Sequence, residues 1–245
     1  MATPIKAKYC RIWVNEFDFS GQSNSLEVDI STAQQDVSTF QNTGKTFLAL
    51  DPEGTINQVG FFDDADAGYL EQEIAESIEN AETLYVAALF GTQTAACPAY
   101  VAPSTNTESM NISGSVGGVI EFKGGWPAGG GLKRGLRLYS GTISATGGVT
   151  HIDLGAAGSA GGWVWLFVRD ITDTAVDAEI TVESDTSSGF GTAATEATFT
   201  FSDVGGFEAT MTGTVNRYVR LNRTDLGGAT DFTVGAVVAV AGVTM

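Results

Sequence analysis

The run Ser25-Leu-Glu-Val-Asp-Ile30 constrains the fold of this chain more than any other feature. Leu26, Val28 and Ile30 alternate with polar residues, which is the period of a β-strand with one buried face and one wet face. Short runs of the same β-forming character recur along the chain, at 9–14, 47–50, 56–62, 83–90, 107–123 and at about eight places beyond residue 135. With 31 Gly and 5 Pro, the composition favours many short strands joined by Gly-rich turns. We therefore expect a mainly β protein.

One segment has the period of a helix. Leu70, Ile74 and Ile78 recur every four residues between about Asp66 and Asn80, and glutamates occupy the other faces. The pattern predicts a single amphipathic helix, which packs on the core through a face formed by Leu70, Ile74 and Ile78.

Turn residues suggest where the chain divides. Asp51-Pro-Glu-Gly54 is predicted to be a turn, and the Gly-rich run Gly124–Gly131 is predicted to be a linker. We therefore expect two domains. Residues 1–130 would form a β-sandwich or barrel with one helix and two polar-faced hairpins, near 24–41 and 106–123. Residues 131–245 would form a second β-sandwich, immunoglobulin-like or jelly-roll.

The charge of the chain narrows its possible partners. Lys and Arg number 12 against 29 Asp and Glu, for a net charge of −17, and Thr46 to Phe122 contains no basic residue. Such a surface repels a phosphate backbone, so ordinary nucleic-acid binding is disfavoured. Met1 to Lys8 lacks the apolar segment of a signal peptide, and the longest apolar runs are too short to cross a bilayer. We expect folding in a cytoplasm without a membrane partner.

The candidate catalytic and ligand-binding motifs lack the residues or the spacing that their chemistry requires. His151 is the single histidine, and no G-x-S-x-G accompanies it. Asp63–Gly68 lacks the ligand spacing of a calcium loop, and Gly124–Lys133 lacks the Ser or Thr that follows the lysine of a phosphate loop. Cys10 and Cys97 are too few for a disulfide framework. The sequence therefore predicts no catalytic residue, no cofactor and no metal.

Two groups of residues leave alternatives open. Trp163 and Trp165 share one face of a strand, where they either pack in a core or form a platform for a sugar. Arg217, Arg220 and Arg223 either line a solvated strand face or pair with acidic residues of another subunit.

The order of several short motifs carries a family resemblance. The chain reads W-V-N-E-F-D-F-S-G from Trp13, N-S-L-E-V-D-I from Asn24 and D-V-S-T-F-Q-N-T-G-K from Asp36, followed by a strand and the acidic helix. Its second half contains E-S-D-T-S-S-G-F-G-T-A-A-T from Glu183. In this order of motifs the chain resembles the major tail proteins, or tail tube proteins, of long-tailed (siphovirus-type) bacteriophages.

The resemblance implies a structural virion protein. Its copies would form hexameric rings stacked into a hollow tail tube, assembled in the host cytoplasm, through which double-stranded DNA passes without adhering. Tail terminator, tape measure and tail-tip proteins would be its partners. The helix would brace the ring, residues 132–245 would decorate the exterior, and loops Gln41–Lys45 and Pro103–Asn106 would reach the next ring. The implied lumen-facing residues are Ser25, Glu27, Asp29, Ser109, Asn111 and Glu121.

Two other functions stay open at this point. One is a different virion protein, either a head-decoration or a tail-tip β-sandwich. The other is a carbohydrate-binding module that uses Trp163 and Trp165.

Overall fold

A computed structural model describes residues 9–36, 47–61, 75, 78–79, 83–92, 96–129 and 131–243, with the backbone alone at 33–35 and 47–52. The contacts divide the chain into two compact units. Unit 1 contains Met1–Gly21, Tyr85–Val101 and Arg134–Met245, and unit 2 contains Gln22–Leu84 and Ala102–Lys133. The division therefore does not follow one boundary near residue 130, because segments from the first half of the chain belong to both units.

The largest sheet explains this division. It has eight strands in the order β15-β12-β17-β9-β6-β5-β1-β2, so strands from both halves of the chain share it. Their bounds are β1 Cys10–Val14, β2 Phe17–Asp18, β5 Leu84–Phe90, β6 Pro98–Thr105, β9 Lys133–Ile143, β12 Gly162–Thr172, β15 Gly205–Met211 and β17 Asp231–Val240. A 3₁₀ turn, η2 (Phe19–Gly21), follows β2.

This sheet is curled into a half-barrel. Four strands separate β1 from β12 in the sheet order, so a flat sheet would hold them roughly 24 Å apart. The rings of Trp13 on β1 and Phe167 on β12 nevertheless have centroids 5.6 Å apart. Gly235 on β17 allows this approach, because a Cβ there would lie 2.7 Å from Trp13 Cζ3. Trp13, Leu89, Trp165, Phe167 and Val237 form the core on the concave side.

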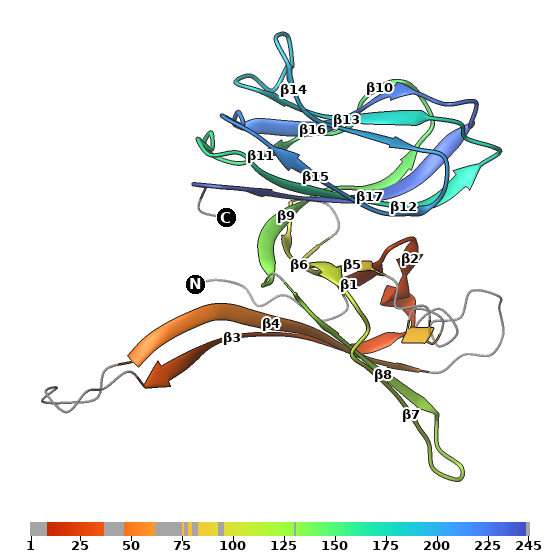
Figure 1. The fold of residues 1–245 in the computed structure, drawn as a ribbon. Helices are drawn as coiled ribbons and strands as arrows, with labels where there is room; N and C mark the ends of the chain where they lie inside the picture. The colour runs from red at the N-terminus through yellow and green to blue at the C-terminus, as the bar shows by residue number, and fades with distance from the viewer. Residues whose placement is uncertain are drawn as a thin grey trace, which may run out of the picture. The chain divides into compact units, whose positions relative to one another are not determined.

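A smaller sheet packs on the other face of β12 and β17 (Figure 1). Its order is β10-β16-β13-β14, and β11 also pairs with β16. The bounds are β10 Gly147–Gly148, β11 Ile152–Asp153, β13 Ala178–Asp185, β14 Ala194–Phe201 and β16 Tyr218–Asp225. The core between the two sheets includes Val164, Leu166, Ile180 and Leu221. Both faces of β12 are therefore buried, which accounts for its almost unbroken apolar sequence.

Unit 2 is built on a four-stranded antiparallel sheet in the order β3-β4-β8-β7. The bounds are β3 Ser23–Asp36, β4 Phe47–Phe61, β7 Ser109–Ser113 and β8 Glu121–Pro127. Figure 1 shows β3 and β4 as a long two-stranded ribbon. The first predicted hairpin, near 24–41, is therefore one strand of a longer hairpin that ends at Phe61.

Two predicted breaks in unit 2 are wrong. The predicted turn Asp51–Gly54 lies inside β4, where Pro52 pairs with Thr32 beside a register shift between Thr32 and Gln34. Proline is tolerated there because a bulge interrupts the ladder of hydrogen bonds.

The first part of the predicted linker Gly124–Gly131 is also a strand, because β8 continues to Pro127. Gly124 is needed for packing rather than for flexibility. A Cβ at this position would lie 3.0 Å from Trp126 Cη2 and 3.3 Å from Phe122 Cε1. The glycine therefore lets two large rings cover the backbone.

The predicted helix falls almost entirely outside the described residues. Within it, Ala75, Ile78 and Glu79 are helical, and Ile78 is 43% exposed. Leu70 and Ile74, which complete its predicted packing face, lie outside the described residues. No helix among the described residues is long and apolar enough to span a membrane.

Candidate functional site

The register of unit 2 brings the six predicted lumen residues onto one face of its sheet. In the β3–β4 hairpin Ser25, Glu27 and Asp29 pair with Val59, Asn57 and Thr55. In the β7–β8 hairpin Ser109, Asn111 and Ser113 pair with Gly125, Lys123 and Glu121. The pairing of β4 with β8 joins the two sets, since Asn57 lies opposite Gly125 and Val59 opposite Lys123. Residues directly opposite each other in antiparallel strands project from the same face.

We call this surface the polar face. Its side chains are Ser25, Glu27, Asp29, Ser31, Glu53, Thr55, Asn57, Val59, Phe61, Ser109, Asn111, Ser113, Glu121, Lys123 and Pro127. One cross-strand contact is direct, because Asn57 Nδ2 donates to Asp29 Oδ2 over 3.4 Å. The face carries four carboxylates, those of Glu27, Asp29, Glu53 and Glu121, and one ammonium group, that of Lys123. The face is therefore acidic and hydrogen-bonding, without a cluster of cations that could hold phosphates.

The opposite face of the same sheet is apolar. Ile56 and Trp126 are fully buried and Phe122 is almost so, while Leu26 and Val28 on β3 are half-buried. The alternation in the sequence therefore separates a wet face from an apolar face that is packed around Ile56, Phe122 and Trp126, while Ile30 and Ile112 on this apolar face are 56% and 41% exposed.

Gln58 is the polar exception on the packed face. It is 1% exposed, and its Nε2 donates to Ser23 Oγ over 2.5 Å. Its Oε1 has no hydrogen-bond partner among the described residues, and neither does the buried Trp126 Nε1. Unpaired buried atoms of this kind lower the free energy of unfolding.

The sheet of unit 2 has two edge strands. β3 and β7 are its terminal strands, and among the described strands neither has a neighbour on its outer side. β3 runs for 14 residues, so a long edge of the sheet has no neighbouring strand among the described strands.

The end of the β7–β8 hairpin is apolar and exposed. Val116 is fully exposed, and Val119 and Ile120 are 66% and 46% exposed. A turn closes the hairpin, with Gly118 N donating to Ser115 O over 2.9 Å and Gly117 at a φ of 82°. Exposed apolar residues gathered at one tip favour an intermolecular contact.

One of the two loops expected to reach a neighbouring ring is part of a strand. Pro103–Thr105 ends β6, and the buried Thr105 donates its hydroxyl proton to Pro127 O. The expectation for Pro103–Asn106 is therefore wrong for most of its length. Gln41–Lys45, the other loop, lies outside the described residues.

The tryptophans expected as a possible sugar platform lie in the core of unit 1. Trp165 is fully buried, and its Nε1 donates to Glu208 Oε2 over 2.6 Å. Trp163 is half-buried against the same concave core. A sugar cannot stack on Trp165, so this form of the carbohydrate-binding expectation is wrong.

Arg220 and Arg223 on β16, and Arg217 just before it, have partners within the chain. Arg217 pairs with Asp153 over 2.7 Å, and Arg220 with Glu183 over 2.8 Å. Arg223 is buried, donates to the carbonyl of Ile143 and lies 5.2 Å from the centroid of the Phe232 ring. Burial lowers the pKa of Arg223. Arg217 and Arg220 therefore have carboxylate partners within the chain, whereas Arg223 Nε and Nη2 are buried without a hydrogen-bond partner among the described residues.

The remaining side chains that could take part in a reaction are one histidine and two cysteines. His151 packs between Phe190 and Tyr218, and the nearby Asp153 carboxylate is occupied by Arg217. Cys10 and Cys97 are free thiols whose pKa values are raised by burial. The described residues contain no group of three or more His, Cys, Asp or Glu side chains arranged for a metal. Asp63–Gly68 lies outside them.

No family model and no curated protein matches the chain. The fold is similar to solved structures of phage-type tails. A chain in the C6-symmetric tail of an empty gene transfer agent particle is 15% identical, with a TM-score of 0.40, over 53% of this chain and 97% of its own. A chain of the SPP1 tail tube is 12% identical, with a TM-score of 0.43, over 54% and 78%.

A hub protein is similar as well. The Dit protein of SPP1, a paradigm of the hub adsorption apparatus of phages that infect Gram-positive bacteria, is 10% identical with a TM-score of 0.32. This similarity covers 94% of the present chain and 98% of the Dit chain. At these identities the similarities concern the fold alone.

Proposed function

We propose that this chain is the structural subunit of a phage-type tail tube, in which hexameric rings stack around a channel for double-stranded DNA. One observation carries the proposal. Glu27, Asp29 and Glu121 project from one face of a sheet whose two outer strands have no neighbour among the described strands. Copies of such a sheet can pair edge to edge and close on themselves, which removes every open edge.

The two faces of the sheet decide its orientation in a ring. The apolar face is covered around Ile56, Phe122 and Trp126, which are buried within the chain, although Ile30 and Ile112 on this face are exposed. The polar face is therefore the one that would line the channel. Its excess of carboxylates would repel the phosphates of DNA and keep the strand from adhering during ejection.

The apolar hairpin tip supplies a contact for stacking. Val116, Val119 and Ile120 would be buried against the ring above or below, which removes their exposed surface from water. The tail terminator, tape measure and tail-tip proteins would be the other partners of the subunit, as the sequence resemblance implies. In this account the subunit performs no catalysis.

Cysteine labelling of assembled tubes tests the orientation. In a Cys10→Ala, Cys97→Ala background, Glu27→Cys would place a thiol on the polar face, and Thr200→Cys would place one on the exposed side of β14. A maleimide carried on a long polyethylene glycol chain is too large to enter a closed channel. We expect it to modify the thiol at 200 in tubes and in free subunits, and the thiol at 27 in free subunits alone. Equal modification at 27 in both states would contradict a lumenal polar face.

A further inference from the structure

A cluster of aromatic rings lies on the outer side of the five-stranded sheet, in unit 1. We call it the ring cluster, and it consists of His151, Phe190 and Tyr218. The His151 ring lies 5.8 Å from Phe190 and 5.5 Å from Tyr218, measured between ring centroids. All three side chains are partly exposed. The side chains that continue into the core from β16, such as Val219 and Leu221, leave from the opposite face of the strand.

Arg220 is fixed underneath the ring cluster. Its Cζ lies 4.1 Å from the centroid of the Phe190 ring, and its Nε donates to Glu183 Oε2 over 2.9 Å. Gly148 on β10 makes room for the guanidinium, because a Cβ at this position would lie 2.5 Å from Arg220 Cζ. The planar group is thus held between a glycine backbone and an aromatic ring, and it supports Phe190 from below.

The loop that carries Phe190 is held in an unusual conformation. Phe190 has a φ of 50°, a region that bulky residues seldom occupy, and glycines stand on both sides of it. Asp185 anchors the loop, since its carboxylate accepts hydrogen bonds from Ser187 N and Thr192 N, each over 2.9 Å. These bonds lower the pKa of Asp185. The ring is therefore presented in a fixed position, at a cost in backbone energy that a glycine would avoid.

The charges around the ring cluster are neutralised in pairs. Arg217 donates to both oxygens of Asp153, each over 2.7 Å, and its Cζ lies 5.1 Å from the Tyr218 ring centroid. Glu183 accepts from Arg220 and also from Asn222 Nδ2 over 2.7 Å. The surface offers fixed hydrogen-bonding groups without an excess of positive charge, on a chain whose net charge is −17. A polyanion is disfavoured on such a surface.

We propose that the ring cluster, with the Arg217–Asp153 pair at its edge, is a binding site for a neutral saccharide chain. The C–H faces of sugar rings would pack on Phe190, His151 and Tyr218, and their hydroxyl groups would bond to the guanidinium and carboxylate groups beside them. Because Phe190 and Arg220 are positioned before binding, little conformational entropy is lost when the saccharide binds. The site is separate from the polar face and does not depend on the tail tube proposal.

Affinity electrophoresis tests this site. The full-length protein is run in native gels that contain hydroxyethyl cellulose, laminarin, xylan or dextran, and in a gel without polysaccharide. Heparin serves as the polyanion control. We expect retardation in at least one of the four neutral polysaccharides and none in heparin. Retardation in none of the four, or in heparin alone, would overturn the proposal.

The decisive variant is Phe190→Gly, which removes the ring and suits the positive φ, so that the fold is retained. Its dissociation constant in the retarding gel should rise about tenfold, the effect of losing one well-placed aromatic contact. Phe61→Ala is the matched control, because Phe61 is 45% exposed on β4 of unit 2. It should migrate as the unchanged protein does. A Phe190→Gly protein that is retarded as strongly as the unchanged protein would refute the assignment to the ring cluster.

Discussion

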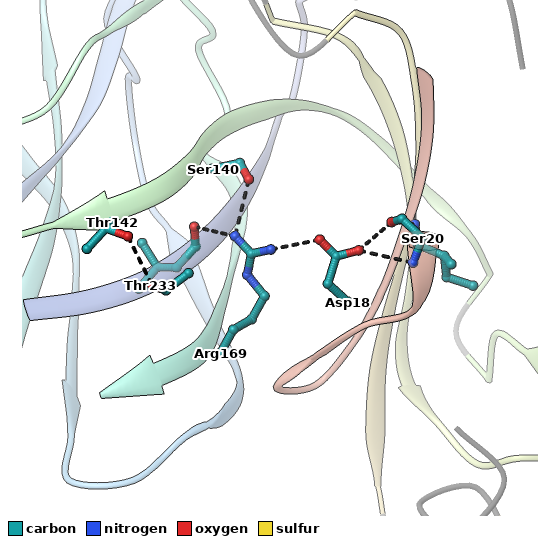
Figure 2. Close-up of polar contacts among 8 residues, drawn as sticks. Asp18, Ser20, Ser140, Thr142, Arg169 and Thr233 are labelled. Carbon is teal, nitrogen blue, oxygen red and sulfur yellow. Dashed lines mark hydrogen bonds and ion pairs between the residues drawn. The ribbon is translucent and has the colours of Figure 1, made fainter. Parts of the chain in front are cut away.

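Arg169 on β12 forms an ion pair with Asp18 on β2, with 2.8 Å between Nη1 and Oδ2 (Figure 2). β2 is a terminal strand of the eight-stranded sheet, and five strands separate it from β12. The pair therefore spans the mouth of the half-barrel. Arg169 also donates to Ser140 Oγ and to Val234 O, each over 3.2 Å, and Asp18 accepts from the backbone N–H of Ser20.

Breaking this pair should loosen the half-barrel. Asp18→Ala leaves the Arg169 side chain, which is 13% exposed, without its carboxylate partner, and burial already lowers the pKa of Arg169. We expect the free energy of unfolding to fall by about 1–3 kcal/mol in urea titrations. Asp153→Ala removes an exposed pair and serves as the control, with a smaller loss expected. Equal losses for the two variants would show that the Asp18–Arg169 pair does not brace the sheet.

Gly235 should not tolerate a side chain. In Gly235→Ala the new Cβ would meet the ring of Trp13 at 2.7 Å, and the ring is enclosed on all sides by the concave core. Overpacking of this kind costs about 1–3 kcal/mol of unfolding free energy. Gly21→Ala is the control, since its Cβ would meet nothing within 4 Å. Thermal unfolding of the two proteins compares them, and a Gly235→Ala protein as stable as Gly21→Ala would count against the close packing of Trp13 on β17.

Acid should destabilise the five-stranded sheet through two carboxylates. The hydrogen bond from Arg217 lowers the pKa of Asp153 from 3.8 to about 2, and backbone N–H groups lower the pKa of Asp185. A folded pKa below the unfolded one means that each carboxylate stabilises the fold above about pH 4. This contribution is lost as the pH falls through the pKa of the folded state, which is about 2 for Asp153.

Asp185→Asn isolates one of these contributions. The amide oxygen can accept only part of the bonds that the carboxylate accepts from Ser187 and Thr192, so the variant should be less stable at neutral pH. As the pH falls below 4, it should lose less stability than the unchanged protein. Urea midpoints measured across that range give the answer, and parallel curves for the two proteins would contradict the role given to Asp185.

Reversing the charge of the polar face should slow the passage of DNA. Glu27→Lys with Asp29→Lys adds two cations to the face that carries Lys123, where they would attract phosphates. Particles carrying the variant should assemble tails but release DNA more slowly, most of all at low salt. The same reversal at Glu179 and Asp203, in unit 1, is the control. Normal release from the Glu27, Asp29 variant would refute a lumenal polar face.

The local patterns of the sequence predicted local structure well. The alternation around Leu26, Val28 and Ile30 indicated a strand with a wet face, and the pairing with β4 puts Glu27 and Asp29 together on that face. Such a pattern depends only on neighbouring residues, whose side chains point alternately to the two faces of a strand.

The pairing of distant strands could not be predicted in the same way. The residues around Trp13 in the sequence do not indicate that β1 shares a sheet with β9, β12 and β17. The space for the Trp13 ring is provided by Gly235, which is far away in the sequence. Turn signals also misled where tertiary pairing overrides them. Pro52 lies in a strand because a bulge accommodates it, and Gly124 lies in a strand because Trp126 covers it.

Negative-stain electron microscopy of the full-length protein at high concentration, combined with its mass in solution, tests the central claim most directly. The account predicts rings or hollow tubes with an axial channel, and a mass that is a multiple of the 25.5 kDa chain. Single rings that never stack would favour a tail-tip subunit over a tube subunit. A protein that remains monomeric at every concentration, or that forms assemblies without a channel, would contradict the tube proposal.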